Sequence, residues 1–339
     1  MLTNYINQIN NILKPQQLKS HLVLDLFAGC GGLSLGFEAQ GFETYGFEKD
    51  QDCCHSYEKN LRGKCEQIEL TVNSKLSGAS VIIGGPPCQP FSVGGKQKGL
   101  RDSRDGFPIF INAIKQVKPD IWLFENVRGL LYKNKWYFDK ITQSLQDLGY
   151  IIEWKLLNSV DFGVPQNRER LMVVGHRGKF QFPQISAKRI TAGEALGELA
   201  FQVLPDSKFL TPSMDKYIAK YEKASCCKRP RDLHLDKQAR TLTCRNLAGA
   251  TGDMHRIKLP DGRRRRLSIR EAARLQSFPD WFEFYGSETS SYNQIGNAVS
   301  PLLAFYLAKS VRNYLESSYR LSARELKKYT LPQQLSLPL

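Results

Sequence analysis

A cysteine held between prolines is the residue of this chain with the clearest potential for chemistry. Cys88 lies within residues 84–92 (GGPPCQPFS), directly after the apolar run 81–83. The run is short, β-branched and closed by glycines, which predicts a buried parallel strand. Pro86 and Pro87 fix their own φ and keep the residues before them out of the helical region. The thiol is expected on a stiff turn at the carboxyl end of a strand, where open α/β sheets bind ligands. Cys88 is a candidate nucleophile, although most cysteines only pack in cores.

A glycine-rich loop and a glutamate form a second constellation. The loop, residues 28–32 (AGCGG), follows a predicted strand at 22–27, and Glu48 ends the next predicted strand, 44–47. Glycine lets the backbone approach a ligand closely, and a carboxylate about twenty residues further on can accept hydrogen bonds from ribose hydroxyls. The loop is not the dinucleotide GxGxxG, because Ser34 takes the place of the third glycine, and no Gly-Lys-Ser/Thr follows for a Walker phosphate loop. We interpret the pair as a site for a nucleoside-bearing cofactor; the alternative is a tight turn and a surface glutamate.

A carboxylate and two guanidinium groups complete the set. Glu125 follows the apolar residues 121–124 at another predicted strand end, and Arg168 and Arg170 lie within residues 166–170 (QNRER). A carboxylate beside a thiol at the top of a sheet can hydrogen-bond a ring nitrogen and share a proton with it. The guanidinium groups can bind a phosphate or a base carbonyl, or they pair with local carboxylates, which is the commoner case.

The elements that must position these residues alternate between strand and helix. Strands are expected at 22–27, 44–47, 81–83, 121–124, 151–158 and 171–175, and helices at 33–41, 108–117 and 137–148. This alternation predicts an α/β fold with a mostly parallel sheet and helices on both faces. The regularity fades between residues 180 and 265, and helices are again expected at 269–276 and 302–311. The chain is thus predicted to hold an α/β core, an irregular inserted lobe and a return to the core.

The composition indicates a soluble protein with a polyanionic partner. The 339 residues include 48 Lys and Arg against 33 Asp and Glu, which gives a net charge of +15. This excess suits nucleic acid, because neutralisation of phosphates drives non-specific binding. The eight cysteines form no CxxC pair, so we expect reduced thiols and no metal site. No apolar run approaches a membrane span and the N-terminus lacks a secretory signal, which predicts a cytoplasmic protein.

Seven segments, taken in order, resemble the motifs of the cytosine-carbon-5 DNA methyltransferases, the bacterial restriction–modification type in particular. They are residues 25–32, Glu48, 85–89 (GPPCQ), 125–127 (ENV), 166–170, 270–279 and 294–299 (QIGNAV). The resemblance spans residues 22–175 and 265–310. It is specific, because the Pro-Pro-Cys-Gln turn, Glu-Asn-Val and Gly-Asn-Ala-Val would rarely coincide by chance.

The resemblance implies an S-adenosylmethionine-dependent methyltransferase fold, which is Rossmann-like, with a small irregular target-recognition domain. The catalytic and cofactor-binding domain is expected at residues 1–182, the target-recognition domain at 183–280, a return to the catalytic domain at 281–325 and a C-terminal extension at 326–339. Basic residues of the recognition domain would contact the DNA backbone or guanine edges. Thr241, Leu242 and Thr243 stand where a base-reading or duplex-filling loop is expected.

The family's chemistry gives each catalytic residue a role in sequence-specific methylation of DNA. Cys88 would attack carbon 6 of a cytosine flipped out of the duplex, which makes carbon 5 nucleophilic. Glu125 would contact ring nitrogen 3 and the amino group, while Arg170 and Arg168 would hold the base carbonyl and the cysteine turn. The methyl group would pass from S-adenosylmethionine to carbon 5, and loss of the carbon-5 proton would expel the cysteine. Residues 93–106 suit a mobile lid.

The same resemblance assigns further residues to ligands. The cofactor pocket is expected to involve Phe27, Ala28, Gly29, Gly31, Gly32, Leu33, Glu48, Lys49, Gln67, Ile68, Pro86, Phe107, Asn297 and Val299. The family usually binds the adenine amino group with an aspartate before an isoleucine. Here Gln67 and Ile68 align with that pair, so either the Gln67 amide oxygen accepts the hydrogen bond or the alignment shifts. DNA contacts are expected from Gln89, Ser92, Arg240, Arg245, Arg263 and Arg264.

Two other functions fit parts of the same pattern. One is methylation of transfer-RNA cytosine, as in a branch of this family, but the Cys-Phe-Thr motif of that branch does not occur in the sequence. The other is a catalytically inactive protein that binds DNA or cofactor, which would have no reason to keep Cys88, Glu125 and Arg170. The expected partners are double-stranded DNA and a cognate restriction endonuclease that acts separately. The enzyme itself is expected to be a monomer without membrane contact.

Overall fold

Seven strands form one sheet with the first strand near its centre. The computed structural model describes residues 3–16, 21–87, 105–184, 188–224, 231–249 and 252–317. The strands are β1 (Leu22–Leu26), β2 (Glu43–Glu48), β3 (Lys64–Gln67), β4 (Val81–Gly84), β5 (Ile121–Val127), β6 (Ile151–Asn158) and β7 (Glu169–His176). Their order is β3-β2-β1-β4-β5-β7-β6. Strands β1 to β5 pair in parallel, and β7 runs antiparallel to both of its neighbours. The expected mostly parallel α/β sheet is confirmed.

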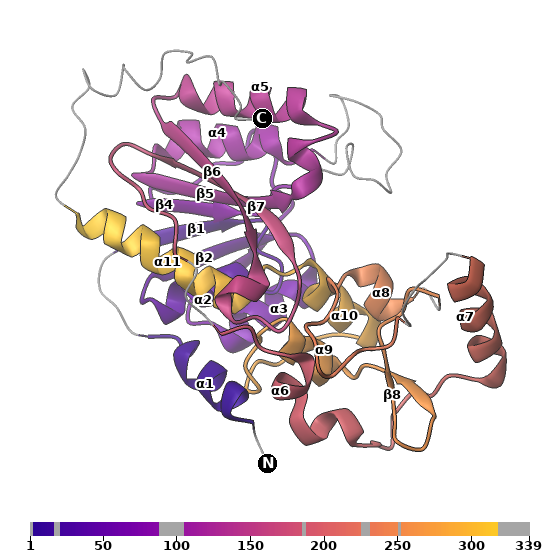
Figure 1. Cartoon of the computed structure of the whole chain (residues 1–339). Coiled ribbons are helices and arrows are strands. Elements are labelled where there is room, and N and C mark those ends of the chain that lie inside the picture. Colours follow the sequence, from indigo (N-terminus) through magenta and orange to yellow (C-terminus); the bar gives the residue numbers. More distant parts are fainter. Residues whose placement is uncertain are drawn as a thin grey trace.

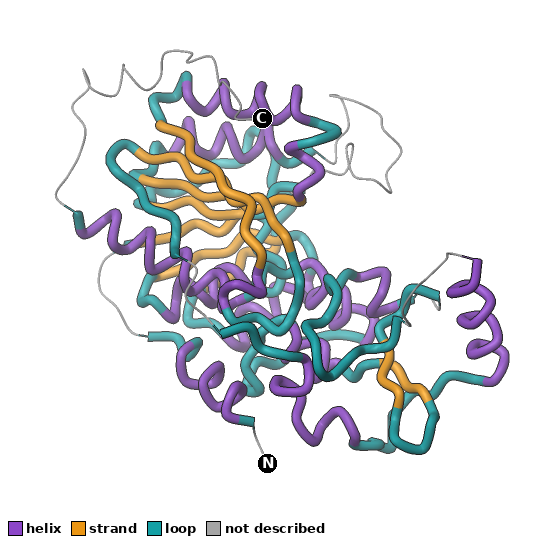
Figure 2. Tube along the Cα trace, viewed as in Figure 1, coloured by secondary structure: helices purple, strands orange, loops and turns teal. Residues whose placement is uncertain are grey.

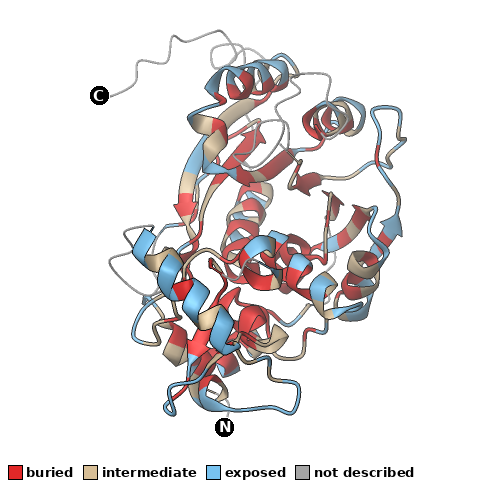
Figure 3. Ribbon diagram, turned by 90° about the vertical axis from the view of Figure 1, so that its right-hand side faces the viewer, coloured by how far each residue is buried: buried red, intermediate tan, exposed pale blue. Residues whose placement is uncertain are grey.

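Helices cover both faces of the sheet (Figures 1 and 2). α2 (Gly32–Ala39) and α11 (Pro301–Glu316) pack on one face, and α4 (Phe107–Val117) and α5 (Lys135–Gln146) pack on the other. α11 begins with a proline, whose missing N–H is not needed at the first helical position. Gly36 lets α2 and α11 approach closely, since a Cβ there would lie 2.4 Å from the carbonyl carbon of Ala304. Buried residues accordingly fill the sheet and the inner helix faces (Figure 3).

The strand order reverses between β1 and β4. From β1 the sheet continues to β2 and β3, and from β4 it continues the other way to β5. Loops at the carboxyl ends of two such strands diverge and leave room for a ligand. The glycine loop follows β1 and the Pro86–Pro87 turn follows β4, so the two sequence motifs flank this point.

The remaining elements form an irregular lobe beside the sheet (Figure 1). They are α6 (Ala192–Leu196), α7 (Pro212–Ala224), α8 (Cys244–Ala248), β8 (Arg256–Lys258), β9 (Arg264–Arg266), α9 (Ile269–Leu275) and α10 (Glu288–Asn297). α1 (Asn4–Ile12), α3 (Gln51–Asn60) and the 3-10 turns Arg128–Leu131, Ser159–Phe162 and Gly197–Phe201 complete the described elements. No helix in the described ranges combines the length and the apolar character needed to cross a membrane.

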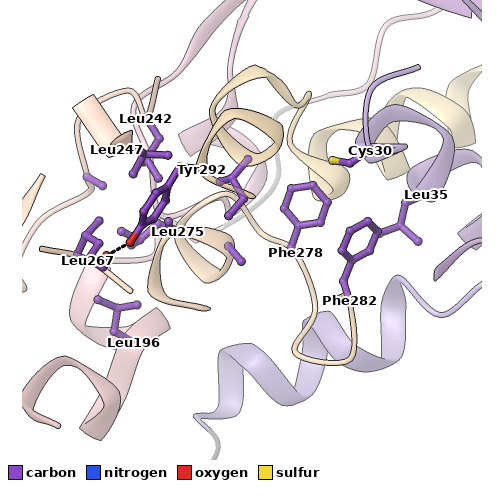
Figure 4. Close-up of a cluster of buried hydrophobic side chains, with 14 of the residues drawn as sticks. Cys30, Leu35, Leu196, Leu242, Leu247, Leu267, Leu275, Phe278, Phe282 and Tyr292 are labelled. Atoms are coloured by element: carbon purple, nitrogen blue, oxygen red, sulfur yellow. Dashed lines mark hydrogen bonds between the residues drawn. The ribbon is translucent and has the colours of Figure 1, made fainter. Parts of the chain in front are cut away.

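One hydrophobic core runs from the sheet's helices into this lobe (Figure 4). Phe278 and Phe282 pack with Cys30 of the glycine loop and Leu35 of α2, and the same cluster reaches Leu242 in the lobe. The expected domain boundary at residue 280 lies between the two phenylalanines, inside this core. The two lobes therefore share buried surface and support each other's position.

The structure contains several helices and strands that the sequence did not predict. β3 was not predicted, and neither were α7 and α10. α7 buries only Ile218, so it shows little of the apolar periodicity by which a helix is recognised. By contrast, β6 lies at the expected residues 151–158. β5 extends to Val127, because its pairing with β7 continues as far as Arg170.

Candidate active site

The glycine loop after β1 is folded beside an open space. Its backbone takes positive φ at Phe27 (63°), Gly29 (54°) and Gly31 (87°). Such values are unstrained for glycine but costly for phenylalanine, and strain of this kind clusters at functional sites. A Cβ at Gly31 would lie 2.7 Å from Tyr57, whereas a Cβ at Gly29 would meet no atom within 4 Å. Packing therefore requires Gly31, and Gly29 borders the open space.

Glu48 at the end of β2 joins this loop to the neighbouring strands. Its Oε2 accepts the Gly29 N–H at 2.9 Å, and its Oε1 accepts the Lys49 N–H at 2.8 Å. Gln67 is the partner of Glu48 on β3, and Ile68 donates its N–H to the Glu48 carbonyl at 2.8 Å. The half-buried carboxylate is thus held beside Gly29, where it can also accept hydroxyl groups of a ligand.

The other predicted cofactor residues lie around this edge of the sheet or beneath it. A Cβ at Gly32 would lie 2.6 Å from the Val299 carbonyl oxygen, so the start of α2 packs closely on this segment. Leu33 and Val299 are buried in the core under the loop, and Phe107 is fully buried at the start of α4. Asn297 ends α10 with its side chain exposed. Of these residues Asn297 is the exposed one, and its Oδ1 accepts the Cys244 thiol at 2.9 Å.

Asp25 is a buried carboxyl group beneath the glycine loop. It is 1% exposed, and the Ser34 hydroxyl donates to its Oδ2 at 2.6 Å. Burial raises the pKa of Asp25 to about 7, and the hydrogen bond from Ser34 lowers that pKa only in part. The protonated form is therefore favoured in the folded protein well above the pH at which an exposed aspartate ionises.

We expect Asp25 to make the protein less stable as the pH rises from about 4 to about 7. Between pH ~4 and ~7 the folded chain holds a proton here that the unfolded chain does not, so the free energy of unfolding falls across this window. Asp25→Asn should remove this part of the pH dependence. Thermal unfolding of both proteins at about pH 5 and about pH 8 measures the difference. Equal changes in melting temperature in the two proteins would contradict the prediction.

Backbone contacts hold the turn that precedes Cys88. The Asn126 Nδ2 donates to the Pro86 carbonyl at 3.0 Å, and the Gly106 N–H donates to the Pro87 carbonyl at 3.0 Å. Asn126 belongs to the Glu-Asn-Val motif, but the sequence offered no role for it; the structure shows that it fixes the turn. Cys88, the predicted DNA contacts Gln89 and Ser92, and the predicted lid up to residue 104 lie outside the described residues.

Glu125 and Arg170 form an ion pair that faces this turn. The Arg170 Nε lies 2.7 Å from the Glu125 Oε1, and each side chain is 13% exposed. The antiparallel pairing of β5 with β7 brings them together, because Val127 stands opposite Arg170. A Cβ at Gly85 would lie 3.8 Å from the other Glu125 oxygen, Oε2. The pair presents an oriented carboxylate and guanidinium donors next to the turn that precedes Cys88.

Arg168 is buried between segments of the two lobes. Its Nη1 donates to the Leu242 carbonyl at 2.8 Å, and its Nη2 donates to the carbonyls of Gly296 at 3.2 Å and Ala298 at 3.0 Å. Burial, helped by the charge of Arg170, lowers the pKa of Arg168 to about 9. All of these contacts are to main-chain carbonyls, so the structure places Arg168 as a tie between the lobes. The base contact expected for it has no support from this geometry.

We expect Arg168→Lys to lower both stability and activity. Lysine lacks the planar fork of donors with which Arg168 bonds carbonyls on two separate segments, and each buried carbonyl left unpaired costs about 1–3 kcal/mol. Thermal unfolding should show a loss of several degrees, and methylation should slow at least about tenfold. Arg189→Lys is the matched control, because Arg189 pairs with Asp161 on the surface and is 67% exposed. An Arg168→Lys protein as stable and active as this control would overturn the assignment.

The predicted base-reading segment docks on the residues that precede β7. The Leu242 N–H donates to the Gln166 Oε1 at 2.8 Å, and the Thr241 hydroxyl donates to the Asn167 carbonyl at 2.6 Å. The Leu242 side chain is fully buried, and Thr243 caps α8. Within this segment Leu242 therefore serves the core, and Gln166 is a docking residue whose role the sequence did not reveal.

The predicted DNA-binding arginines differ in how far their charges are already engaged. Arg245 is exposed on α8. Arg240 and Arg263 each pair with one aspartate, whereas Arg264 lies between two aspartates at 3.0 Å from each. Arg245 is thus the most available of the four for a phosphate or a base, and the charge of Arg264 is largely neutralised within the lobe.

The five cysteines in the described ranges are free thiols. Burial raises the pKa of Cys30 to about 12, and it also raises the pKa of Cys54 and Cys244. A thiol with a raised pKa is a poor nucleophile at neutral pH. Within the same ranges no three His, Cys, Asp or Glu side chains are grouped so that they could hold a metal ion.

Known proteins are similar to this chain in sequence and in fold. A family model described as C-5 cytosine-specific DNA methylase matches residues 22–313. The type II methyltransferase M.AplI of Arthrospira platensis is 56% identical over 321 residues, which are 94% of this chain and 92% of that protein. M.FnuDI of Fusobacterium nucleatum, also a type II methyltransferase, is 34% identical over 91% of this chain and 99% of its own length. Among solved structures, the Entamoeba histolytica methyltransferase EhMeth has the same fold, with a TM-score of 0.69 at 18% identity over 88% of this chain and 100% of that one. The chain therefore belongs to the C-5 cytosine-specific DNA methylase family and is a DNA (cytosine-5-)-methyltransferase.

Proposed function

We propose that this enzyme methylates carbon 5 of a cytosine within a specific sequence of double-stranded DNA, with S-adenosylmethionine as methyl donor. The observation that carries the proposal is the Glu125–Arg170 ion pair, which faces the turn before Cys88 at the point where the strand order reverses. The carboxylate and the guanidinium group lie beside the turn that leads to Cys88, and covalent catalysis on a pyrimidine ring would require a thiol next to such a pair.

Each of these side chains has a task in the proposed reaction. The Cys88 thiolate adds to carbon 6 of the flipped cytosine and makes carbon 5 an enamine carbon. Glu125 binds ring nitrogen 3 and the amino group, so charge that develops on the ring is neutralised. Arg170 orients Glu125 and donates to the base carbonyl. After carbon 5 has taken the methyl group, its proton is lost, and the electron pair of that bond re-forms the ring double bond and expels the thiolate.

The residues around the glycine loop fit the methyl donor. S-adenosylmethionine supplies a methyl group on a positively charged sulfur, which activates it for transfer. Gly29 leaves open space beside the loop, and the held carboxylate of Glu48 would accept the ribose hydroxyls. Gln67, next to Glu48 on β3, would accept the adenine amino group through its amide oxygen.

Transfer of a labelled methyl group tests the proposal. Plasmid DNA and bulk transfer RNA are incubated separately with the protein and methyl-labelled S-adenosylmethionine, and the labelled bases are mapped. Label on carbon 5 of cytosine in DNA, within one recurrent sequence, is the expected result. Label in transfer RNA alone would replace DNA by RNA as the substrate. No label in either, from protein that binds the donor, would refute the proposed activity.

A role in restriction–modification follows from the kind of relatives that the chain has. M.AplI and M.FnuDI, the two sequence relatives named above, are type II methyltransferases. We infer that the enzyme protects DNA from a separate endonuclease of the same sequence specificity. Plasmid methylated by this protein should resist the endonuclease that recognises the mapped sequence, and an unmethylated plasmid should be cut.

A further inference from the structure

Helix α7 separates its charges between two faces. Ile218 is its one buried residue, and it is flanked on the same face by Asp215 and Glu222, at spacings of three and four residues. Lys216, Lys220 and Lys223 recur at spacings of four and three on another face. Residues at such spacings share one side of an α-helix. The two acidic residues of α7 therefore lie on the side of Ile218, and the three lysines lie on a different side of the helix.

The inward acids fasten α7 to the small sheet of the lobe. The Asp215 Oδ1 lies 3.0 Å from the Arg264 Nη1 on β9, and the Glu222 Oε1 lies 2.8 Å from the Arg256 Nη2 on β8. Asp232 joins the two arginines, at 2.5 Å from the Arg256 Nε and 3.0 Å from the Arg264 Nε. Arg256 is fully buried, so its ion pairs with Glu222 and Asp232 are largely shielded from water, whereas the Asp215 side chain is 39% exposed. Asp215 and Glu222, the acidic residues of α7, are thus both paired with arginines of the small sheet.

The outward face of α7 is left purely basic. Lys216, Lys220 and Lys223 are exposed, and no described residue forms an ion pair with any of them. Figure 1 shows α7 at the right-hand edge of the lobe, away from the helices that cover the sheet. A rigid helix carrying unpaired cations at its surface is suited to a polyanion.

We propose that this face of α7 binds the phosphate backbone of the DNA that the enzyme methylates. The proposal rests on DNA being the substrate. From Lys216 to Lys223 the helix rises about 10 Å, and one strand of a duplex carries about three phosphates over that length of its axis. Lysine on a flexible stem binds phosphate as a point charge and carries no base preference. The contact would thus strengthen binding to any DNA sequence and leave the choice of target to other residues.

Salt-dependent binding tests this surface. The variant Lys216→Gln/Lys220→Gln/Lys223→Gln keeps good helix formers and removes three positive charges. Its affinity for two duplexes, one with the mapped target sequence and one without it, is measured over a series of salt concentrations. We expect the slope of log affinity against log salt to become shallower by about two to three for both duplexes. The melting temperature, the affinity for S-adenosylmethionine and the set of methylated sequences should not change.

A control with the same change of net charge isolates the surface. Lys14→Gln/Lys118→Gln/Lys309→Gln also removes three charges from exposed lysines, on elements outside the irregular lobe, and should keep the slope of the native protein. An α7 variant with the slope of this control would overturn the proposal. Weaker binding to the target duplex alone would overturn it too, because that result indicates base reading. If the native protein labels no DNA at all, the proposed function fails, and that outcome is distinct from a normal pattern of methylation with an unchanged slope.

Discussion

Cys88→Ser is expected to abolish methylation and to leave the binding of S-adenosylmethionine nearly intact. A serine hydroxyl ionises far less readily than a thiol, so addition to carbon 6 should slow by at least about a thousandfold. The backbone of the turn should be kept, because Asn126 and Gly106 hold it through the carbonyls of Pro86 and Pro87. Transfer of labelled methyl groups measures activity, and calorimetry measures donor binding. A serine variant with substantial activity would remove Cys88 from the mechanism.

The covalent step can be observed directly. Fluorine in place of the carbon-5 hydrogen of the target cytosine prevents the final proton loss, so the cysteine should remain attached to the DNA. The native enzyme should then form a complex that survives denaturation, and Cys88→Ser should not. Cys53→Ser is the matched control, since Cys53 is a half-exposed thiol on α3. This control should label DNA and form the complex as the native enzyme does.

Glu125→Gln should slow turnover by about two to four orders of magnitude, with DNA affinity changed only a few-fold. The amide keeps the shape of the side chain and can still accept a hydrogen bond from Arg170, which lies 2.7 Å from the carboxylate. It cannot neutralise charge on the ring or share a proton with ring nitrogen 3. Single-turnover methyl transfer separates this chemical effect from DNA binding.

The neighbouring glutamate provides the control for this substitution. Glu169 pairs with Arg128 at 2.8 Å, and their side chains are 41% and 64% exposed, so Glu169→Gln should change activity little. A Glu125→Gln enzyme that turns over at the native rate would show that the carboxylate takes no part in the reaction. Equal slowing in both variants would point to a general effect of lost negative charge at this sheet edge.

The central strands β4 and β5 could be predicted because each contains a short apolar run that ends at glycine or at a carboxylate. β4 and β6 fall where the residue pattern placed them. α7 could not be predicted, because ion pairs hold its inner face and only Ile218 is buried. Apolar periodicity in a sequence identifies helices that bury an apolar face. A helix that is held in place mainly by ion pairs therefore cannot be recognised from it.

The active site shows a similar division. Motif residues could be assigned to a common sheet edge, since the carboxyl ends of parallel strands meet there, and the Glu125–Arg170 pair follows from strand pairing. The difference between Arg168 and Arg170 could not be read from the sequence. Both are arginines in one short motif, yet one faces the cysteine turn and the other is buried among main-chain carbonyls. Only three-dimensional neighbours separate these roles.

The anchoring of Leu242 through its main chain has a consequence for how such enzymes diversify. Gln166 accepts its N–H and Arg168 donates to its carbonyl, and every residue type except proline offers both groups. These two main-chain contacts therefore do not depend on which side chain stands at position 242. Under the proposed function, exposed positions around Leu242 could differ between enzymes without loss of these main-chain contacts, and a new sequence specificity could then arise while the catalytic residues stay the same.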